Sequence, residues 1–244
     1  MRIAVAGGTG TVGAHVVALA RAAGHEPLVL SRSHGVDLAG SGDLDLAGVD
    51  VVIDASGVQA TSAEKSRAFF RAVTERLLRA EAAAGVAHHV ALSIVGAARA
   101  PHGYYAGKAL QERIVSAGGV PWTILRATQF FEFADQVAVR VGPFAVVPAM
   151  RSQPLAAEAV ARRLVEIAEG APLGDAPDVA GPEELRMAEL ARAVRAGRGE
   201  RGRVFELPLP GGFGRAIRDG SILPGEGARL LGPRFEEWIA ERSS

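Results

Sequence analysis

The chain of 244 residues contains no cysteine, which excludes disulfides, thiolate nucleophiles and cysteine-ligated metals. It carries no net charge, because 27 basic residues balance 27 acidic ones, so no global electrostatic attraction to nucleic acid or to an anionic membrane is expected. No apolar run approaches the roughly 18–20 residues that a membrane span needs. These absences favour a cytoplasmic protein that binds neither nucleic acid nor membrane.

Lysine and histidine are also scarce. Lys65 and Lys108 are the only lysines, so arginine supplies 25 of the 27 basic residues. The six histidines include no pair with a metal-ligand spacing, so no metal site is expected. Hydrophobic residues nevertheless make up 48% of the chain, which is enough for a sizeable core and argues against general disorder.

Short apolar runs alternate with stretches of helical periodicity from the start of the chain to about residue 180. Buried strands are predicted near residues 2–7, 27–31, 49–54, 89–95 and 121–127, with helices between them. A short further strand is expected at "GVDL", residues 35–38, although the stretch 31–49 is brief and one helix there is expected to reduce to a turn. This pattern predicts an α/β fold, with a Rossmann-type, doubly wound, mainly parallel sheet and helices on both faces.

No linker divides the chain, so residues 1–244 are predicted to form a single Rossmann-type domain. Its dinucleotide-binding part is expected mainly in residues 1–130. A small substrate-binding or lid portion is expected mainly in residues 131–244.

The opening "GGTGTVG" follows a predicted strand and precedes a predicted helix, which is the context of a dinucleotide-binding turn. Gly7 would allow the tight turn, Gly10 would let a pyrophosphate approach the backbone, and Gly13 would let the helix pack closely on the sheet. The alternative is a turn of purely structural use. Further contacts to the phosphates are expected from Thr9, Thr11 and Val12.

The end of the second strand is where the adenosine ribose of a dinucleotide is expected. An acid there would favour NAD, but the chain has Ser31, Arg32 and Ser33, and a cation with two hydroxyls suits the 2′-phosphate of NADP. NADP is therefore the expected cofactor, with NAD as the alternative, and a solvated Arg32 is the competing interpretation. Asp37 and Leu38 lie where an adenine edge would be read, unless Asp37 only caps a turn.

Tyr104 and Lys108 are four residues apart and would share one face of a helix. A lysine cation beside the tyrosine would lower the pKa of the phenol toward the working range. Ser93 ends the preceding strand, where its hydroxyl would hold a substrate oxygen. Together these three residues predict proton transfer at a carbonyl or hydroxyl group.

These motifs, with "VVIDASG", "ALSIVGA", "GYYAGK" and "PWTILRATQFFEF", resemble the short-chain dehydrogenase/reductase superfamily over roughly residues 1–185. The resemblance is to its atypical or extended branch of NmrA-like, NAD(P)H-binding proteins. It implies that Gly7, Gly10 and Gly13 bind the pyrophosphate and that Arg32 lies near the 2′-phosphate. It also implies a catalytic triad of Ser93, Tyr104 and Lys108. It implies that Ala55, Ser56 and Gly57 run along the cofactor ribose, and that Thr128 lies beside the nicotinamide amide.

The expected function is an NADP(H)-dependent oxidoreductase that transfers hydride to or from a small carbonyl, hydroxyl or quinone-like substrate. Two alternatives stay open: a non-catalytic NAD(P)-sensing regulator, and a nucleotide-sugar epimerase or dehydratase. The substrate pocket is expected near Phe130, Phe131 and His102, because ligands bind at the carboxyl ends of parallel strands. The expected partner is a small-molecule substrate, and the protein is expected to be a monomer or a homodimer.

Overall fold

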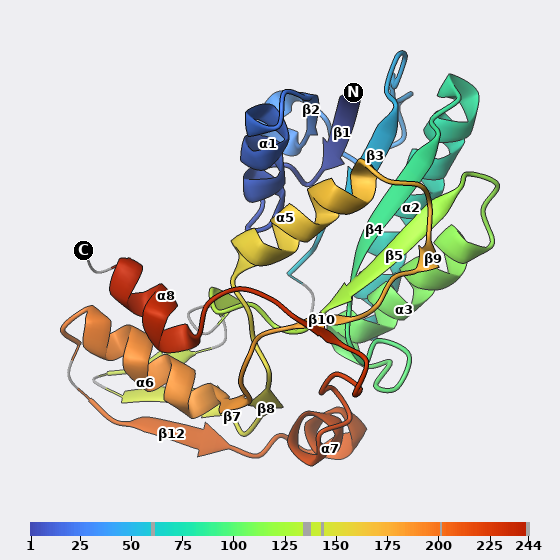
Figure 1. The fold of residues 1–244 in the computed structure, drawn as a ribbon. Coiled ribbons are helices and arrows are strands. Elements are labelled where there is room, and N and C mark those ends of the chain that lie inside the picture. Colours follow the sequence, from blue (N-terminus) through green and yellow to red (C-terminus); the bar gives the residue numbers. More distant parts are fainter. Residues whose placement is uncertain (60–61, 134–137, 143, 201, 243–244) are drawn as a thin grey trace.

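The central feature of the fold is an eight-stranded sheet with the order β13-β10-β5-β4-β3-β1-β2, and β9 pairs with β5 beside this path (Figure 1). The computed structural model describes residues 1–59, 62–133, 138–142, 144–200 and 202–242. Every pairing between the described strands of this sheet is parallel. The strands are β1 (Arg2–Ala6), β2 (Glu26–Leu30), β3 (Val51–Asp54), β4 (His88–Ile94), β5 (Trp122–Ala127), β9 (Gly174–Asp175), β10 (Val179–Ala180) and β13 (Arg229–Leu230).

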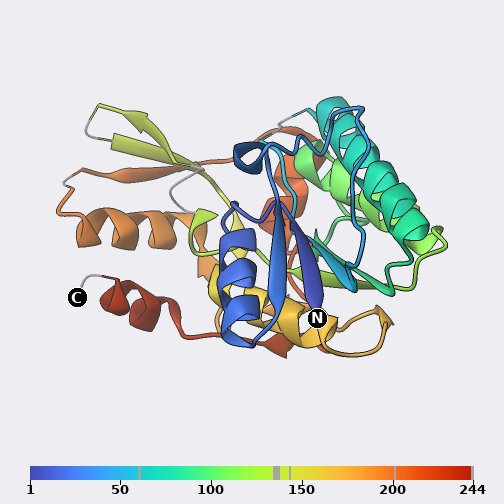
Figure 2. The same cartoon turned by 90° about the horizontal axis from the view of Figure 1, so that it is seen from above.

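Helices cover both faces of the sheet, as Figure 2 shows from above. Helices α1 (Gly13–Ala22) and α5 (Ala157–Ala168) lie on one face, and α2 (Ala63–Ala84) and α3 (Gly103–Ser116) lie on the other. None of the helices in the described residues is long and apolar enough to cross a membrane. The prediction of a doubly wound, Rossmann-type α/β fold is confirmed.

The central strands are buried on both faces, which explains their continuous apolar sequences. In β1, Ile3 and Val5 belong to the core beneath α1 and α5, whereas Ala4 and Ala6 belong to the core beneath α2. Helix α2 ends where predicted, because Gly85 takes a left-handed conformation with φ +71°.

The predicted strand at residues 35–38 is wrong. After β2 the chain forms a 3₁₀ turn, η1 (Arg32–His34), and reaches β3 without another strand. The connection is too short for a full strand and crossover helix, so it instead inserts Leu38 and Leu46 into the core beside α2. Strand β2 is consequently the edge of the sheet.

The C-terminal part adds a smaller layer at the carboxyl end of the sheet. Strands β12, β7 and β6 form a three-stranded sheet, and β8 pairs with β11. Strands β7 and β12 and helix α7 are not predicted from the sequence, because these segments are rich in Gly and Pro or lack a clear hydrophobic periodicity. The elements of this layer are β6 (Val139–Val141), β7 (Phe144–Pro148), β8 (Arg151–Ser152), β11 (Leu185–Arg186), α6 (Met187–Gly197), β12 (Val204–Leu207), α7 (Gly211–Asp219) and α8 (Phe235–Glu241).

The chain returns to the main sheet within its second half. Helix α5 packs on the same core as α1, and β10 and β13 extend the sheet beyond β5. Residues after 131 therefore contribute to both the main sheet and the smaller layer.

The crossing of α2 and α3 requires a residue without a side chain at Gly107. A Cβ there would lie 2.1 Å from Ser66 Oγ and 2.5 Å from Phe70 Cδ2. We expect Gly107→Ala to lower the free energy of unfolding by about 1–3 kcal/mol, because overpacking outweighs the better helix propensity of alanine. Urea denaturation followed by circular dichroism measures this change.

Gly119→Ala is the matched control, since no atom lies within 4 Å of a Cβ at that position. We expect it to alter the free energy of unfolding by less than about 0.5 kcal/mol. Equal effects of the two substitutions would contradict the close crossing of the two helices.

Candidate active site

The glycine turn after β1 is as compact as its sequence predicts. Gly7 has φ +73°, and its N–H donates to Leu30 O at 2.9 Å. The Gly10 N–H donates to Gly7 O at 2.8 Å, and a Cβ at Gly13 would lie 2.2 Å from that same oxygen. Thr9, Gly10 and Thr11 are exposed on the rim of the turn, whereas the side chain of Val12 is buried in the core.

The turns after β1 and β3 touch each other. A Cβ at Gly7 would lie 2.8 Å from both Ala55 O and Ser56 Cα. The next residue, Gly57, is exposed, and a Cβ there would lie 3.5 Å from the hydroxyl oxygen of Tyr104. The structure therefore joins the glycine turn, the turn after β3 and Tyr104 into one surface at the carboxyl end of the sheet, where ligands of open α/β sheets bind.

The end of β2 brings two hydroxyls and a histidine together. Ser31 Oγ lies 3.0 Å from Ser33 Oγ and 3.0 Å from His34 Nδ1. Arg32 is exposed, and although its carbonyl accepts from Gly35 N–H, its guanidinium makes no hydrogen bond or ion pair with the rest of the described chain. Its guanidinium is therefore available to an anion, and His34 is a further polar group that the sequence analysis did not single out.

Asp37 and Leu38 have different environments. Asp37 lines a cavity of about 540 Å³ along the open edge of β2, together with residues of β2 and of the segment 43–45. Leu38 is buried in the core, so its side chain cannot read an adenine edge as expected. Gly7, Arg32 and Tyr104 do not line this cavity, but Leu30 and His34 do, so the cavity adjoins the end of β2.

Tyr104 lies at the start of α3, with its ring 5.4 Å from that of Phe70. Burial, the negative charge of Asp54 and the neighbouring Tyr105 raise the pKa of the Tyr104 phenol. The expected lowering of that pKa by Lys108 is not found, because the lysine turns toward other partners. Tyr104 is therefore protonated at neutral pH.

The ammonium of Lys108 is fully enclosed and has all three of its protons engaged. It donates to Leu92 O at 2.8 Å, to Gln111 Oε1 at 2.8 Å and to Ser56 O at 3.4 Å. The ammonium also lies 4.3 Å from the centre of the Phe70 ring. Burial lowers the pKa of Lys108 to about 8, against the opposing charges of Asp54 and Glu112. Lys108 thus ties the carboxyl ends of β3 and β4 to α3.

Ser93 also has a partner other than the expected one. Its hydroxyl donates to Glu112 on α3, in a short hydrogen bond. Glu112 in turn accepts two hydrogen bonds from Arg126, at 3.0 and 2.9 Å. In the described part of the chain no hydrogen bond joins Ser93, Tyr104 and Lys108 to one another, so the three lie in one region without forming a bonded triad.

Thr128 and Tyr105 are committed to internal hydrogen bonds. The Thr128 hydroxyl donates to Gln153 O and its N–H to Val179 O. These bonds leave it no free donor for the nicotinamide amide. Tyr105 accepts a hydrogen bond from Gln129 Nε2 at 3.0 Å.

The three residues expected in the substrate pocket differ in exposure. His102 is exposed beside α7, where its Nε2 would lie 3.1 Å from a Cβ at Gly212. Phe130 is partly buried against the main core. Phe131 is completely buried and packs on Phe235 and Trp238, so it belongs to the core of the smaller layer and cannot line an open pocket.

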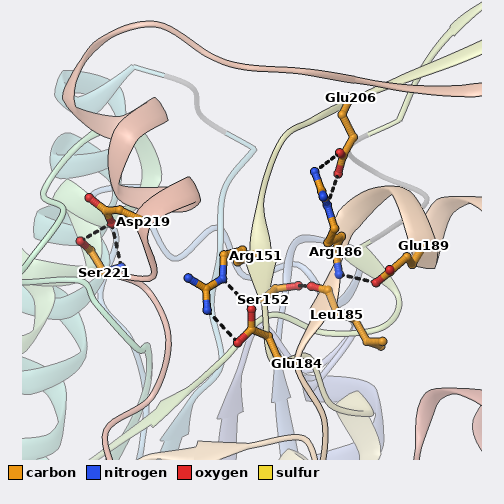
Figure 3. A network of polar contacts seen from close by, with 9 residues as sticks. All are labelled: Arg151, Ser152, Glu184, Leu185, Arg186, Glu189, Glu206, Asp219 and Ser221. Atoms are coloured by element: carbon orange, nitrogen blue, oxygen red, sulfur yellow. Dashed lines mark hydrogen bonds and ion pairs between the residues drawn. The ribbon is translucent and has the colours of Figure 1, made fainter.

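A second cavity, of about 400 Å³, lies in the smaller layer and is lined by residues of β8, β11 and α7. Figure 3 shows the polar contacts of three of its lining residues, Arg151, Glu184 and Arg186. Arg151 and Glu184 pair through two hydrogen bonds of 2.6 and 3.0 Å. Arg186 pairs with Glu206 of β12. These ion pairs connect the strands of the layer, and the cavity contains none of the predicted site residues.

Comparisons with known proteins concern the family and the fold of the chain. A family model described as NAD(P)H-binding matches residues 41–170, which is more than half of the chain. None of the curated proteins matches the chain in sequence.

Solved structures similar to the chain include three proteins under 25% identical to it. A short-chain dehydrogenase/reductase superfamily protein from Agrobacterium tumefaciens with bound NAD is 17% identical, covers 100% of this chain and 96% of its own, and has a TM-score of 0.72. The UDP-glucose 4-epimerase of Thermus thermophilus in complex with NAD is 19% identical, with coverage of 100% and 94% and a TM-score of 0.66. An NADPH-dependent quinone oxidoreductase from Escherichia coli, in complex with NADPH, is 18% identical, with coverage of 90% and 88% and a TM-score of 0.62.

These proteins share the fold of the chain, while their activities differ. The family match, by contrast, extends from the loop after β2 through α5 and includes the turn after β3 and the start of α3. The chain therefore belongs to the NAD(P)H-binding family, and one of its structural neighbours is a short-chain dehydrogenase/reductase superfamily protein.

Proposed function

We propose that the chain is an NADP(H)-dependent oxidoreductase that acts on a small carbonyl, hydroxyl or quinone-like substrate. The observation that carries this proposal is the surface that runs from Gly7 past Ala55 and Gly57 to the Tyr104 hydroxyl. A tyrosine at the end of a dinucleotide-binding surface can exchange a proton with a substrate oxygen, which is the partner reaction of hydride transfer.

The residues present fit a dinucleotide. The glycine turn exposes backbone without side chains at the N-terminus of α1, which suits a pyrophosphate. Ser56 supplies a buried hydroxyl without a partner in the turn after β3, where the ribose would run. Arg32, with the hydroxyls of Ser31 and Ser33, would hold a 2′-phosphate. When bound, the nicotinamide supplies hydride chemistry.

Tyr104 would act as the proton donor in the direction of reduction. Its phenol is protonated at neutral pH, as that of an ordinary tyrosine is, so the proton is present when a substrate carbonyl approaches. Lys108 would contribute a fixed positive charge close to the ribose. Ser93 would orient the substrate oxygen only by exchanging its bond to Glu112, which makes Tyr104 the principal acid.

Tyr104→Phe tests the proton donor. We expect kcat/KM for NADPH oxidation to fall by about 10²–10⁴-fold, because proton donation is lost, while the affinity for NADPH stays unchanged. Absorbance at 340 nm against quinones, aldehydes and ketones measures turnover, and quenching of NADPH fluorescence measures binding.

Tyr105→Phe is the matched control, because it removes a neighbouring hydroxyl that bonds only Gln129. The assignment is wrong if Tyr105→Phe abolishes turnover and Tyr104→Phe does not. Tight NADPH binding without turnover of any substrate would instead favour a dinucleotide-sensing regulator. Conversion of a nucleotide sugar without net loss of NADPH would favour an epimerase or dehydratase.

Arg32→Ala tests the choice of cofactor. A charge-assisted hydrogen bond to the 2′-phosphate is worth about 1.5–3 kcal/mol, so the preference for NADP over NAD should fall by roughly 10–100-fold. Dissociation constants for both dinucleotides, measured by calorimetry, check this. Arg162→Ala, which removes an exposed guanidinium paired with Glu158 on α5, should leave the preference unchanged.

An unaltered NADP/NAD ratio in Arg32→Ala would remove this arginine from the cofactor site. The result would leave the role of Tyr104 unaffected, because the two residues lie in different parts of the proposed surface.

A further inference from the structure

The ammonium of Lys108 is held in part by Gln111, whose side chain hydrogen-bonds Lys108 and Asp54. We propose that Gln111 is a positioning residue, whose side-chain amide links the carboxylate of Asp54 to Lys108 and holds the ammonium at the carboxyl ends of β3 and β4.

Gln111 makes both bonds of this link. Its Nε2 donates to Asp54 Oδ2 at 2.8 Å, and its Oε1 accepts from Lys108 Nζ at 2.8 Å. An ionised carboxylate can only accept hydrogen bonds and an ammonium can only donate them, so the amide has a single satisfying orientation. Asp54, Lys108 and Gln111 are all buried, and water cannot replace any of these bonds.

Asp54 also holds the turn that follows β3. Its second oxygen, Oδ1, accepts the N–H of Ser56 at 2.9 Å. One carboxylate therefore fixes both the backbone of the proposed ribose-binding turn and, through Gln111, the ammonium beneath it. The carbonyl oxygen of Ser56 in turn accepts a hydrogen bond from the Lys108 ammonium.

No carboxylate in the described residues forms a direct ion pair with Lys108, so the charge of Asp54 acts across the amide. Titratable groups near the Asp54–Gln111–Lys108 link lie on helices α3 and α2 and on strand β4. Tyr104 and Glu112 lie on α3 with Lys108, and the Glu81–His89 pair joins α2 to β4, with His89 near Asp54. Among the described residues, Gln111 is the one whose side chain hydrogen-bonds both charged partners, whereas Ser56 contacts them through its backbone.

The bond from Lys108 to Ser56 O is the longest of the three, at 3.4 Å. The other two bonds fix the ammonium, so this third proton is the one that can turn toward a ribose hydroxyl. This last step rests on the proposed function, whereas the link through Gln111 does not.

The presence of only two lysines makes a direct test possible. In protein labelled with ¹³C at lysine Cε, NMR should show one signal from exposed Lys65 and one from buried Lys108. Titration with pH gives both midpoints, without cofactor or substrate. We expect Lys108 to titrate below the ordinary lysine value, since burial lowers the pKa of Lys108 to about 8.

Gln111→Glu and Gln111→Met should move the Lys108 midpoint in opposite directions. The glutamate replaces the amide N–H that Asp54 accepts with a second carboxylate oxygen, and at the alkaline pH where Lys108 titrates the added negative charge should raise the midpoint by about 1–3 pH units. The methionine removes an acceptor and the link to Asp54, and should lower it. Thr74→Val is the matched control, because it deletes a buried hydroxyl on α2 and should leave the midpoint unchanged.

An unmoved Lys108 midpoint in folded Gln111→Glu would overturn the proposal, even if Gln111→Met fails to fold. Saturating NADPH should shift the Lys108 signal of the wild-type chain but not that of Lys65. NADPH binding without such a shift would overturn the inference that the third proton of Lys108 turns from Ser56 O toward a ribose hydroxyl. Absence of NADPH binding would overturn the proposed function and leave the pH titration of the Gln111 variants as a separate result.

Discussion

The site depends on the close approach of the backbones that follow β1 and β3. Gly7 lies so near Ala55 and Ser56 on one side, and so near Gly13 on the other, that no Cβ fits at either glycine. This contact fixes where α1 begins and where the turn after β3 runs. Asp54 then holds that turn from beneath, and Gln111 and Lys108 attach α3 to it. The close contact at Gly7 thus determines, through these hydrogen bonds, where α3 and its Tyr104 lie relative to the first strand.

Sequence patterns predicted the parts of the fold that repeat. The central strands and α2 follow from apolar runs and helical periodicity, and Gly7, Gly13 and Gly85 adopt the roles that their positions suggest. The strand at residues 35–38 failed because a short apolar pair, Val36 and Leu38, can also anchor a loop to the core. Helix α7 and strands β7 and β12 were missed because their burial comes from contacts with distant segments.

The orientation of the site residues could be predicted only in part. A spacing of four places Tyr104 and Lys108 on one helix face, yet the long lysine side chain reaches a carbonyl of β4 and one of the turn after β3 instead of the phenol. Gln111, three residues beyond Lys108, shares that face, and Asp54 is a charged residue at the end of a buried strand. Those were the available signals for the link. The pairing of Gln111 with Asp54 was not evident, because it depends on how α3 is placed against the end of β3 in the folded chain.

The open edge of β2 has a consequence for the behaviour of the protein in concentrated solution. Unpaired backbone groups on an edge strand can recruit strands of other molecules and so promote aggregation. Pro27 lies within β2 and lacks an N–H, and the adjoining cavity is lined by Arg21, Arg76 and Asp43. A residue without an N–H and charged side chains are poor templates for an added strand. The missing third strand thus leaves an edge that resists intermolecular pairing.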